Sequence, residues 1–450
     1  MADERCVFQG GSRAVSECPG RNGLYARSVW DASFEDDGLV PPWWPCSVSR
    51  EPWVINFSKL LTRRRIVIHT ANIIAQDWAN MCQAVWRSPL LPIMSIAQAE
   101  RVPSNDNMAF PSIGSGPRFK SDLLAYLRSY GQAKTGPLTK QLQGYDFTAI
   151  RAALVASTPS KVNLRGSDPE TEPLWGWPGL RRVLRSMPAR PASHERPHVV
   201  VQVSSIASLG QSDKWLAGTL LNTLATRSSK YTSPAAETKP RFSIVFPIAD
   251  EIRRSLDGYN SGSSIHMKTQ STAQAKQVEY MRPMLCHWAG DKDGISETQV
   301  TTPIREAGLR RAAPHIKTYI SFSDSTMTNI DWALVTSANL STQAWGSGES
   351  ASGEVRTCSY EIGVLVWPGL YEDGDDRRVE MVPVFKQDQP PAADEHTGKI
   401  IVGFRMPYDL PLVPYSKQEM PWCATAPCPE RDWMGRTWPG FWVSWSVARG

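Results

Sequence analysis

A short pattern occurs twice in the chain, once in each half. VIHTANIIAQDW covers residues 67–78 and LVTSANLSTQAW covers residues 334–345, and each passes from an apolar, strand-like segment to an Asn. In both copies a Trp stands six positions after that Asn, which is Asn72 in the first copy and Asn339 in the second. A match at fixed offsets predicts two related domains that each supply half of one site. Two unrelated strand–loop–helix junctions would give the same match.

Length and patterning also favour more than one domain. The chain has 450 residues, of which 41% are hydrophobic, and this length favours two cores or more. Apolar spacing predicts helices at 76–86 and 119–131, and β-branched apolar runs predict strands at 315–322 and 330–339. Turn-forming residues at 158–175 mark a candidate boundary. Helices and strands mixed in both halves predict an α/β class with layered sheets.

Composition narrows the class of protein. The net charge of +5 permits an anionic partner without requiring one. The eight cysteines show no framework spacing, and Cys423 and Cys428 have no second pair, so we expect reduced thiols and no zinc site. No secretory signal pattern opens the chain, and no apolar run approaches ~18 residues. We therefore expect a soluble, intracellular protein without membrane contact.

The stretch PHIKTYI places a histidine and a lysine two positions apart in an apolar run. Residues i and i+2 of a strand face the same way, so His315 and Lys317 should project together, with Ile316 buried behind them. An imidazole gives or takes a proton near neutral pH, and an ammonium binds phosphate oxygens. With the side-chain amide of Asn339 as a further donor, this set suits phosphoryl transfer without a metal or another cofactor.

Two observations limit this interpretation. A lone His-x-Lys has poor specificity, and the same pattern at His266 and Lys268 stands in a Gly/Ser-rich loop, where we expect a surface position. His315 precedes Asn339 by 24 residues, so the first copy predicts a histidine near position 48. The only histidine in the sequence between positions 40 and 70 is His69, which lies inside the strand-like segment and belongs to no His-x-Lys. The first half-site is therefore incomplete.

Several longer strings are far more specific. In chain order they are IVIHTANIIAQDWANMCQAVWRSPLLP, VQVSSIASLG, PHIKTYI, WALVTSANLSTQAWG, SYEIGVL and PYDLP. They resemble, in the same order, motifs of the tyrosyl-DNA phosphodiesterase family, within the phospholipase D superfamily. The resemblance extends from Arg65 to Trp422.

The resemblance implies a fold and an activity. The fold would be two phospholipase D-like domains, each a mixed β-sheet sandwiched by α-helices, with the active cleft between them. Residues 1–64 would be an atypical, poorly ordered N-terminal segment, 65–165 a partial N-terminal domain, and 166–450 a C-terminal domain. The activity would be hydrolysis of 3′-phosphotyrosyl DNA–peptide adducts through a phosphohistidine intermediate, in DNA repair. The implied partners are single-stranded or nicked DNA 3′ ends and a topoisomerase-derived tyrosyl peptide, bound by a nuclear monomer.

The resemblance also implies roles for the residues that match the family motifs. His315 would be the general acid that protonates the leaving tyrosine oxygen and later the base that activates water. Lys317 and Asn339 would hold phosphate oxygens, and Asn72 would be the remaining phosphate contact of the first half-site.

Five further residues match supporting positions. Gln83 and Glu361 would orient the histidines, although on pattern alone they could equally be a helix-surface Gln and a strand-end Glu. Ser205, Ser208 and Ser341 would contact the DNA backbone, where hydroxyl and backbone N–H groups grip phosphate without reading sequence.

One departure from the family pattern affects activity. The family's nucleophile is the histidine of the first His-x-Lys, and this chain lacks both that histidine and its lysine. Either residues 1–60 replace the genuine segment through an error of exon choice, or the chain is a degenerate, catalytically silent paralogue that binds DNA ends. Loss of a nucleophile should slow turnover by more than the ~10²–10⁴-fold that a general acid or base contributes, so we expect little activity.

A lipid phosphodiesterase is disfavoured because the His-x-Lys-x₄-Asp string is broken at Phe322.

Overall fold

The computed structural model describes most of the chain. The described residues are 24–27, 55–60, 63–72, 75–94, 111–166, 173–188, 196–226, 239–289, 303–372, 378–388, 390 and 399–440. Of the segment 1–64, they include strands β1 (Leu24–Arg27) and β2 (Ile55–Leu60) and the start of β3 (Arg63–His69). The rest of that segment, which the sequence predicts to be poorly ordered, lies outside the described residues.

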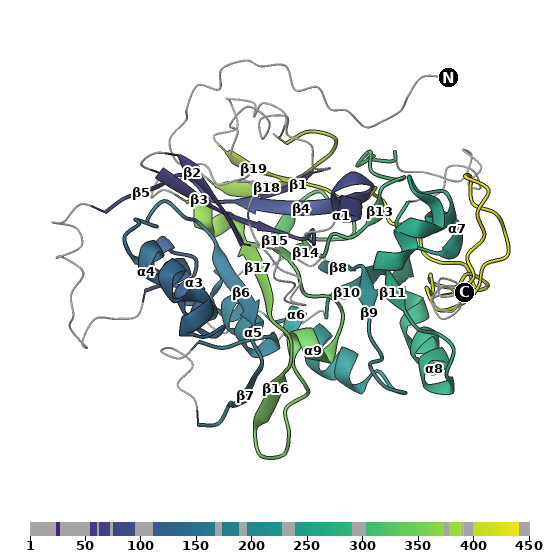
Figure 1. Cartoon of the computed structure of the whole chain (residues 1–450), viewed down its shortest axis with the longest axis horizontal. Helices are drawn as coiled ribbons and strands as arrows, with labels where there is room; N and C mark the ends of the chain where they lie inside the picture. The colour runs from purple at the N-terminus through teal and green to yellow at the C-terminus, as the bar shows by residue number, and fades with distance from the viewer. Residues whose placement is uncertain are drawn as a thin grey trace.

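One mixed sheet runs through the described part of the molecule (Figure 1). Its other strands are β4 (Met81–Arg87), β5 (Leu91–Pro92), β6 (Ala153–Ser157), β8 (His198–Gln202), β10 (Arg241–Val245), β12 (Leu285–Cys286), β13 (Ala313–Pro314), β14 (Thr318–Phe322), β15 (Ile330–Thr336), β17 (Glu361–Val366), β18 (Val379–Val384) and β19 (Ile400–Arg405). The main order is β12-β10-β8-β14-β15-β18-β19-β1-β4-β3-β2, and β17, β6, β13 and β5 join at its sides. The sheet contains parallel and antiparallel pairs.

Helices and two short strand pairs complete the fold. The pairs are β9 (Ser205–Ile206) with β11 (His266–Met267), and β7 (Ser160–Asn163) with β16 (Glu354–Thr357). The α-helices are α1 (Ala75–Ala79), α3 (Gly116–Arg128), α4 (Gln132–Gln143), α5 (Trp177–Ser186), α6 (Asn222–Leu224), α7 (Ala249–Arg253), α8 (Thr272–Met281) and α9 (Thr342–Trp345). Helices α3, α4 and α5 group at one end of the view in Figure 1, and α7 and α8 at the other. None of the helices in the described ranges has the length and apolarity needed to cross a bilayer.

The central strands form as their composition predicts. The Val-rich strand β8 lies between β10 and β14, and Val199, Val200 and Val201 are at most 1% exposed. Continuous apolar runs of this kind are typical of strands that are covered on both faces. Strands β14 and β15 confirm the strands expected at 315–322 and 330–339, although β14 begins only at Thr318.

Helix α3 confirms the helix expected at 119–131, with a start three residues earlier. The Ser115 side chain caps the helix by accepting a backbone N–H of its first turn at 3.3 Å. Phe119 and Leu123 lie on its buried face at 0% exposure. Gly131 lies between α3 and α4 and is the N-cap of α4. Its φ of +92° is a value that favours glycine over residues with a side chain.

The helix expected across residues 76–86 is wrong in its second part. Helix α1 ends at Ala79, and the following residues form strand β4, which pairs with β3, β1 and β13. In β4, Met81, Cys82 and Ala84 are all buried. A short apolar run of a strand buried on both faces can also satisfy helical spacing, which is why the periodicity was ambiguous.

The mixed α/β class is confirmed, but the division into domains stays a prediction. Strands from both expected domains belong to the same sheet, and β17 pairs along five residues with β6. The first copy of the repeated pattern begins in the last residues of β3, and the second copy begins in the last residues of β15. Both asparagines therefore lie just after a strand of this sheet.

Candidate active site

Backbone pairing places His315 and Lys317 where strands from both halves meet. The chain enters this stretch along β13, which pairs with β4, and the His315 N–H donates to the Cys82 carbonyl at 3.1 Å. It then joins β14, and the Lys317 carbonyl accepts the Thr336 N–H at 3.1 Å. The Lys317 Nζ lies 3.4 Å from each nitrogen of the His315 ring, and Ile316 is fully buried. The predicted side-by-side arrangement is therefore confirmed, although both residues precede the strand instead of lying within it.

The His315 ring contacts three residues of the first half. Its Nδ1 lies 3.2 Å from the Gln83 Oε1 and 3.4 Å from the Asp77 Oδ2, and its Nε2 lies 3.4 Å from the Asn72 Nδ2. An Nδ1–H that donates to these oxygens leaves Nε2 as the basic nitrogen, because a neutral imidazole carries one proton. Burial and the nearby Lys317 hold the His315 pKa well below 6.5, so the ring is neutral at pH 7 in the free protein.

A hydrogen-bond network fixes the loop that carries Asn72. The Asp77 Oδ2 accepts the Asn72 backbone N–H at 2.8 Å and its side-chain Nδ2–H at 2.7 Å. The Thr70 hydroxyl donates to the Gln83 Oε1 at 2.8 Å, and the Gln83 Nε2 donates to the Asp77 carbonyl at 3.0 Å. The Trp78 indole donates to the Asn72 carbonyl at 2.8 Å. In the first copy of the repeated pattern, the Trp therefore secures the position of the Asn six residues before it.

Sequence reasoning missed Asp77. Its side chain is fully buried, contacts both Asn72 and His315, and interacts electrostatically with Lys317. Burial raises the Asp77 pKa, while the Asn72 hydrogen bonds and Lys317 oppose the rise. The available signal was an acidic residue in the first turn of a short helix directly after Asn72.

Lys317 is a fully buried amine. Burial lowers its pKa to about 7, and the carboxylates of Asp77 and Glu361 oppose that shift. Burial likewise raises the Glu361 pKa to about 7, opposed by a hydrogen bond from the Ser337 hydroxyl and by Lys317. Burial therefore brings the pKa values of this amine and this carboxyl from opposite sides toward neutral pH.

Asn339 is oriented by the stretch around β9. Its Oδ1 accepts the backbone N–H groups of Ser204 at 3.1 Å and Ser205 at 2.9 Å. Because the oxygen is engaged in this way, the Nδ2–H₂ end is the end presented as a donor to a ligand. Ser205 therefore lies beside Asn339, as a shared site requires.

The other two serines lie differently. Ser208 is exposed, and its hydroxyl accepts a hydrogen bond from Gln274 of α8 at 3.2 Å. The Ser341 hydroxyl accepts the Ala344 N–H at 3.0 Å as the N-cap of α9. Contacts of Ser205, Ser208 and Ser341 with DNA stay a prediction.

His266 is exposed, as expected for this His-x-Lys, but it lies on strand β11 and not in a loop. On β11 it pairs with Ser205, and it interacts electrostatically with both Lys317 and His315. The ring reaches solvent, yet the surrounding protein and the charges of Lys317 and Lys268 lower its pKa.

The first half contributes no His-x-Lys. His69, which ends β3, is buried, and its ring packs against Trp78 with the ring centroids 5.2 Å apart. In the part of the chain that the structure describes, no group of three His, Cys, Asp or Glu side chains could hold a metal ion.

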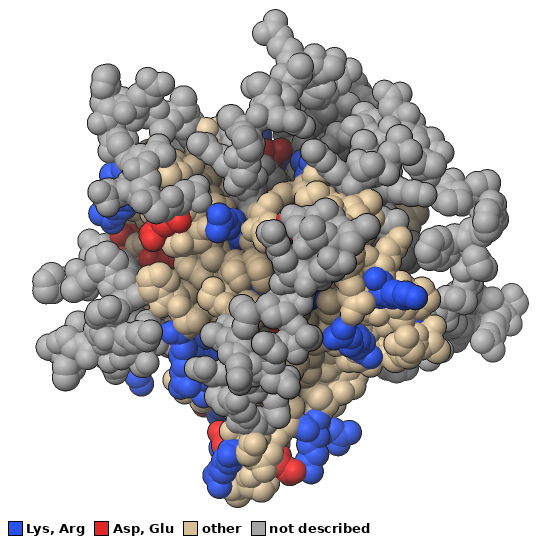
Figure 2. All heavy atoms as spheres, turned by 90° about the vertical axis from the view of Figure 1, so that its left-hand side faces the viewer, with Lys and Arg blue, Asp and Glu red and all other residues tan. Residues whose placement is uncertain are grey.

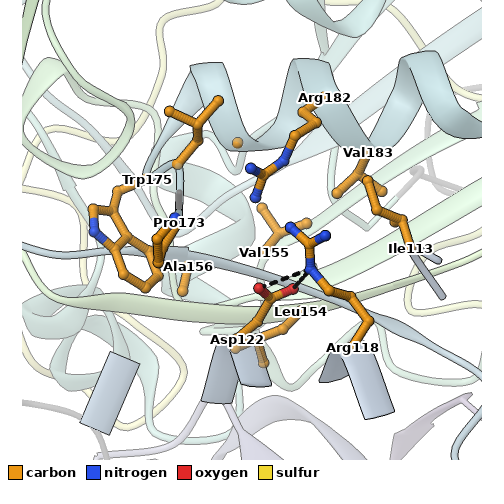
Figure 3. Close-up of a pocket in the computed structure, with 12 residues that line it drawn as sticks. Ile113, Arg118, Asp122, Leu154, Val155, Ala156, Pro173, Trp175, Arg182 and Val183 are labelled. Atoms are coloured by element: carbon orange, nitrogen blue, oxygen red, sulfur yellow. Dashed lines mark hydrogen bonds and ion pairs between the residues drawn. The ribbon is translucent and has the colours of Figure 1, made fainter. Parts of the chain in front are cut away.

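A small pocket lies apart from the residues around His315 (Figure 3). It lies between α3, α5 and β6, where Arg118 and Asp122 form an ion pair at 3.0 Å beside Arg182. Burial and the nearby Arg118 lower the Arg182 pKa to about 10. None of the site residues around His315 lines this pocket, and we interpret it as a packing defect around a buried ion cluster.

Surface charge is dispersed on the face shown in Figure 2. Lys and Arg side chains lie there in small separate groups, with Asp and Glu among them. Lys161 and Glu354 form an exposed ion pair between β7 and β16, at 2.6 Å. This face therefore carries no continuous basic track in its described residues.

Comparison with known proteins identifies the family. Residues 54–416 match the family model described as tyrosyl-DNA phosphodiesterase. The chain is 30% identical, over 84% of its length and 75% of the relative's, to a probable tyrosyl-DNA phosphodiesterase of Schizosaccharomyces pombe. It is 29% identical to tyrosyl-DNA phosphodiesterase 1 of Drosophila melanogaster over 79% of its own length and 54% of that protein's, so it spans about half of the fly protein.

A solved structure shares the fold. The crystal structure of the yeast tyrosyl-DNA phosphodiesterase superposes with a TM-score of 0.55 at 21% identity, covering 83% of this chain and 76% of that chain. The family model covers most of the chain, including the segments that carry His315, Lys317, Asn72 and Asn339. The chain belongs to the tyrosyl-DNA phosphodiesterase family, whose members are phosphodiesterase hydrolases.

Proposed function

We propose that this chain binds the phosphodiester that links a tyrosine to a DNA 3′ end, and that its site is built to hydrolyse that bond during DNA repair in the nucleus. The proposed partners are single-stranded or nicked DNA 3′ ends and a topoisomerase-derived tyrosyl peptide, bound by a monomer. The observation that carries the proposal is the contact between His315 and Asn72, 243 residues apart, at 3.4 Å. That contact joins Asn72 of the first copy of the repeated pattern to the His315–Lys317 stretch of the C-terminal half.

The surroundings of His315 support its role as general acid. In the free protein the ring is neutral, because burial and Lys317 lower its pKa. A phosphodiester brings a negative charge to the centre, and an anion favours the protonated forms of His315 and Lys317. The bound substrate would thereby generate the imidazolium that protonates the leaving tyrosine oxygen.

Lys317, Asn339 and Asn72 would hold the phosphate. The buried ammonium of Lys317 would stabilise charge that develops on the phosphoryl oxygens, where the low local dielectric strengthens the interaction. The Asn339 amide would donate from the C-terminal half, and the Asn72 amide from the N-terminal half. Gln83 would hold the tautomer of His315 through its contact at Nδ1.

The missing nucleophile limits turnover. The sequence holds no His-x-Lys upstream of Asn72 at the spacing that separates His315 from Asn339. A general acid alone contributes about 10²–10⁴-fold. We therefore propose that this chain turns the substrate over slowly or not at all.

A catalytically silent module that binds DNA ends is the second candidate. It is favoured by one observation: the phosphate-binding residues Lys317, Asn339 and Asn72 are all kept while the nucleophile is absent. Such a module would protect a DNA 3′ end or mark it for another enzyme.

A single-stranded oligonucleotide that carries a 3′-phosphotyrosine tests both candidates. We expect binding that weakens as salt rises, because phosphate contacts release counterions. Product on a denaturing gel identifies an enzyme, whereas binding without product over a day identifies the silent module. His315→Ala should abolish any product. If the oligonucleotide binds no better than one with a 3′-hydroxyl, the proposal is wrong.

A further inference from the structure

His266 is held in a defined position by strand pairing. It lies on β11, and its backbone N–H donates to the Ser204 carbonyl at 3.0 Å. Ile265 and Met267 on either side of it are 0% and 2% exposed. Neighbouring side chains of an extended segment alternate, so the His266 ring points away from that core and toward solvent.

The segment that positions His266 also positions Asn339. Ser204 and Ser205 donate their backbone N–H groups to the Asn339 Oδ1, and Ser205 pairs with His266. His266 also interacts electrostatically with Lys317 and with His315. His266 therefore lies on the strand pair that orients Asn339, and it is close enough to Lys317 and His315 to interact with them electrostatically.

We propose that His266 is a substrate-binding residue that hydrogen-bonds the terminal phosphate held by Lys317. The inference rests on the proposed function and adds a third imidazole or amide donor from the C-terminal half. It also changes the interpretation of the His266–Lys268 pattern from an unrelated surface motif to one wall of the site.

The charges around His266 favour this role. Lys317 and Lys268 bring positive charge to His266, and the carboxylates that oppose Lys317 are those of Asp77 and Glu361, both buried. A neutral imidazole keeps one N–H donor, so His266 can bind an anion without carrying a charge of its own. Hydrogen bonds to a charged partner are the stronger kind, which makes this contact measurable.

Binding of two oligonucleotides by the full chain tests the proposal. Fluorescence anisotropy compares one single-stranded oligonucleotide ending in a 3′-phosphate with the same strand ending in a 3′-hydroxyl. His266→Ala should weaken binding of the 3′-phosphate strand about tenfold and leave the 3′-hydroxyl strand unchanged, because one hydrogen bond to a charged group is lost. His266→Gln keeps an N–H donor and should restore most of the lost affinity.

Two further variants separate the possible results. Lys276→Ala, at an exposed position on α8, should affect the binding of both strands equally, since an exposed charge is screened and does not distinguish the two 3′ ends. Lys317→Met should weaken binding of the 3′-phosphate strand. If only His266→Ala has no effect, the role of His266 is wrong and the proposed function stands. If His266→Ala and Lys317→Met both leave phosphate binding unchanged, the proposed function fails as well.

Discussion

At the scale of single residues, Lys317 and Glu361 are ionisable side chains that are buried away from the water that would normally stabilise their charges. Burial brings the Lys317 pKa down from 10.5 to about 7 and the Glu361 pKa up from 4.5 to about 7. The charge of Asp77, the Ser337 hydrogen bond and the attraction of Lys317 and Glu361 for each other offset only part of the effect of burial on these pKa values. Ionisable groups whose pKa values are shifted by burial are common at catalytic and binding sites.

These two shifts make stability depend on pH in opposite senses. From pH 4.5 to 7 the folded chain keeps a proton on Glu361 that the unfolded chain has lost, so the free energy of unfolding falls as pH rises. From pH 7 to 10.5 the unfolded chain protonates Lys317 and the folded chain does not, so the free energy of unfolding rises with pH. The combined contribution of Lys317 and Glu361 to the free energy of unfolding is therefore least favourable near pH 7.

Replacing both groups should therefore stabilise the protein. We expect the double variant Lys317→Met with Glu361→Gln to gain about 1–4 kcal/mol in free energy of unfolding near pH 7, as replacing buried charged groups by uncharged ones of similar size often does. Urea unfolding at pH 5, 7 and 9 measures the gain. A variant that is less stable than the unaltered chain at pH 7 would show that the pair stabilises the fold.

At the scale of elements, the site depends on strand β4, which the sequence pattern wrongly predicted to be part of a helix. Strand β4 carries Gln83 to the His315 ring and pairs with β13, which leads the chain to His315. Helical spacing of its apolar residues predicted a helix instead. The strand could be recognised only from its neighbours, because periodicity does not separate a short buried strand from a buried helix.

Gln83 distinguishes the two assignments. On an exposed helix surface, Gln83→Met would change stability by less than ~0.5 kcal/mol. In β4 the side chain accepts from Thr70 at 2.8 Å and contacts His315, and it is 1% exposed. We expect Gln83→Met to lower the free energy of unfolding by about 1–3 kcal/mol, because the buried Thr70 hydroxyl loses its acceptor.

Thermal and urea unfolding measure this loss. Gln141→Met, at an exposed position on α4, is the matched control and should be neutral. Equal behaviour of the two variants would contradict the placement of Gln83.

At the scale of the whole molecule, one sheet connects both halves and the site lies where they meet. Strand β17 from the C-terminal half pairs with β6 from the N-terminal half, and β13 pairs with β4. The contact of His315 with Asn72 adds a direct side-chain link. Shared strands of this kind favour joint unfolding of the two halves, whereas the two-domain prediction permits separate unfolding.

A core substitution in the N-terminal half tests which holds. Leu123 of α3 is fully buried, and Leu123→Ala should lower the free energy of unfolding by about 2–5 kcal/mol. With joint unfolding, circular dichroism and tryptophan fluorescence should report one shifted transition. Two transitions, of which only one moves, would instead support two independently folding domains.

The sequence by itself determined the repeated asparagines, the adjacent His315 and Lys317, the α/β class and the family. These follow from local spacing and from ordered motifs, which the chain carries without reference to its fold. Only the tertiary structure decided that Asp77 joins the site and that His266 borders it. The physical reason is that both positions depend on contacts between segments far apart in the chain. Asp77 of α1 meets His315, which follows β13, and the β9–β11 pair places His266 beside Ser205.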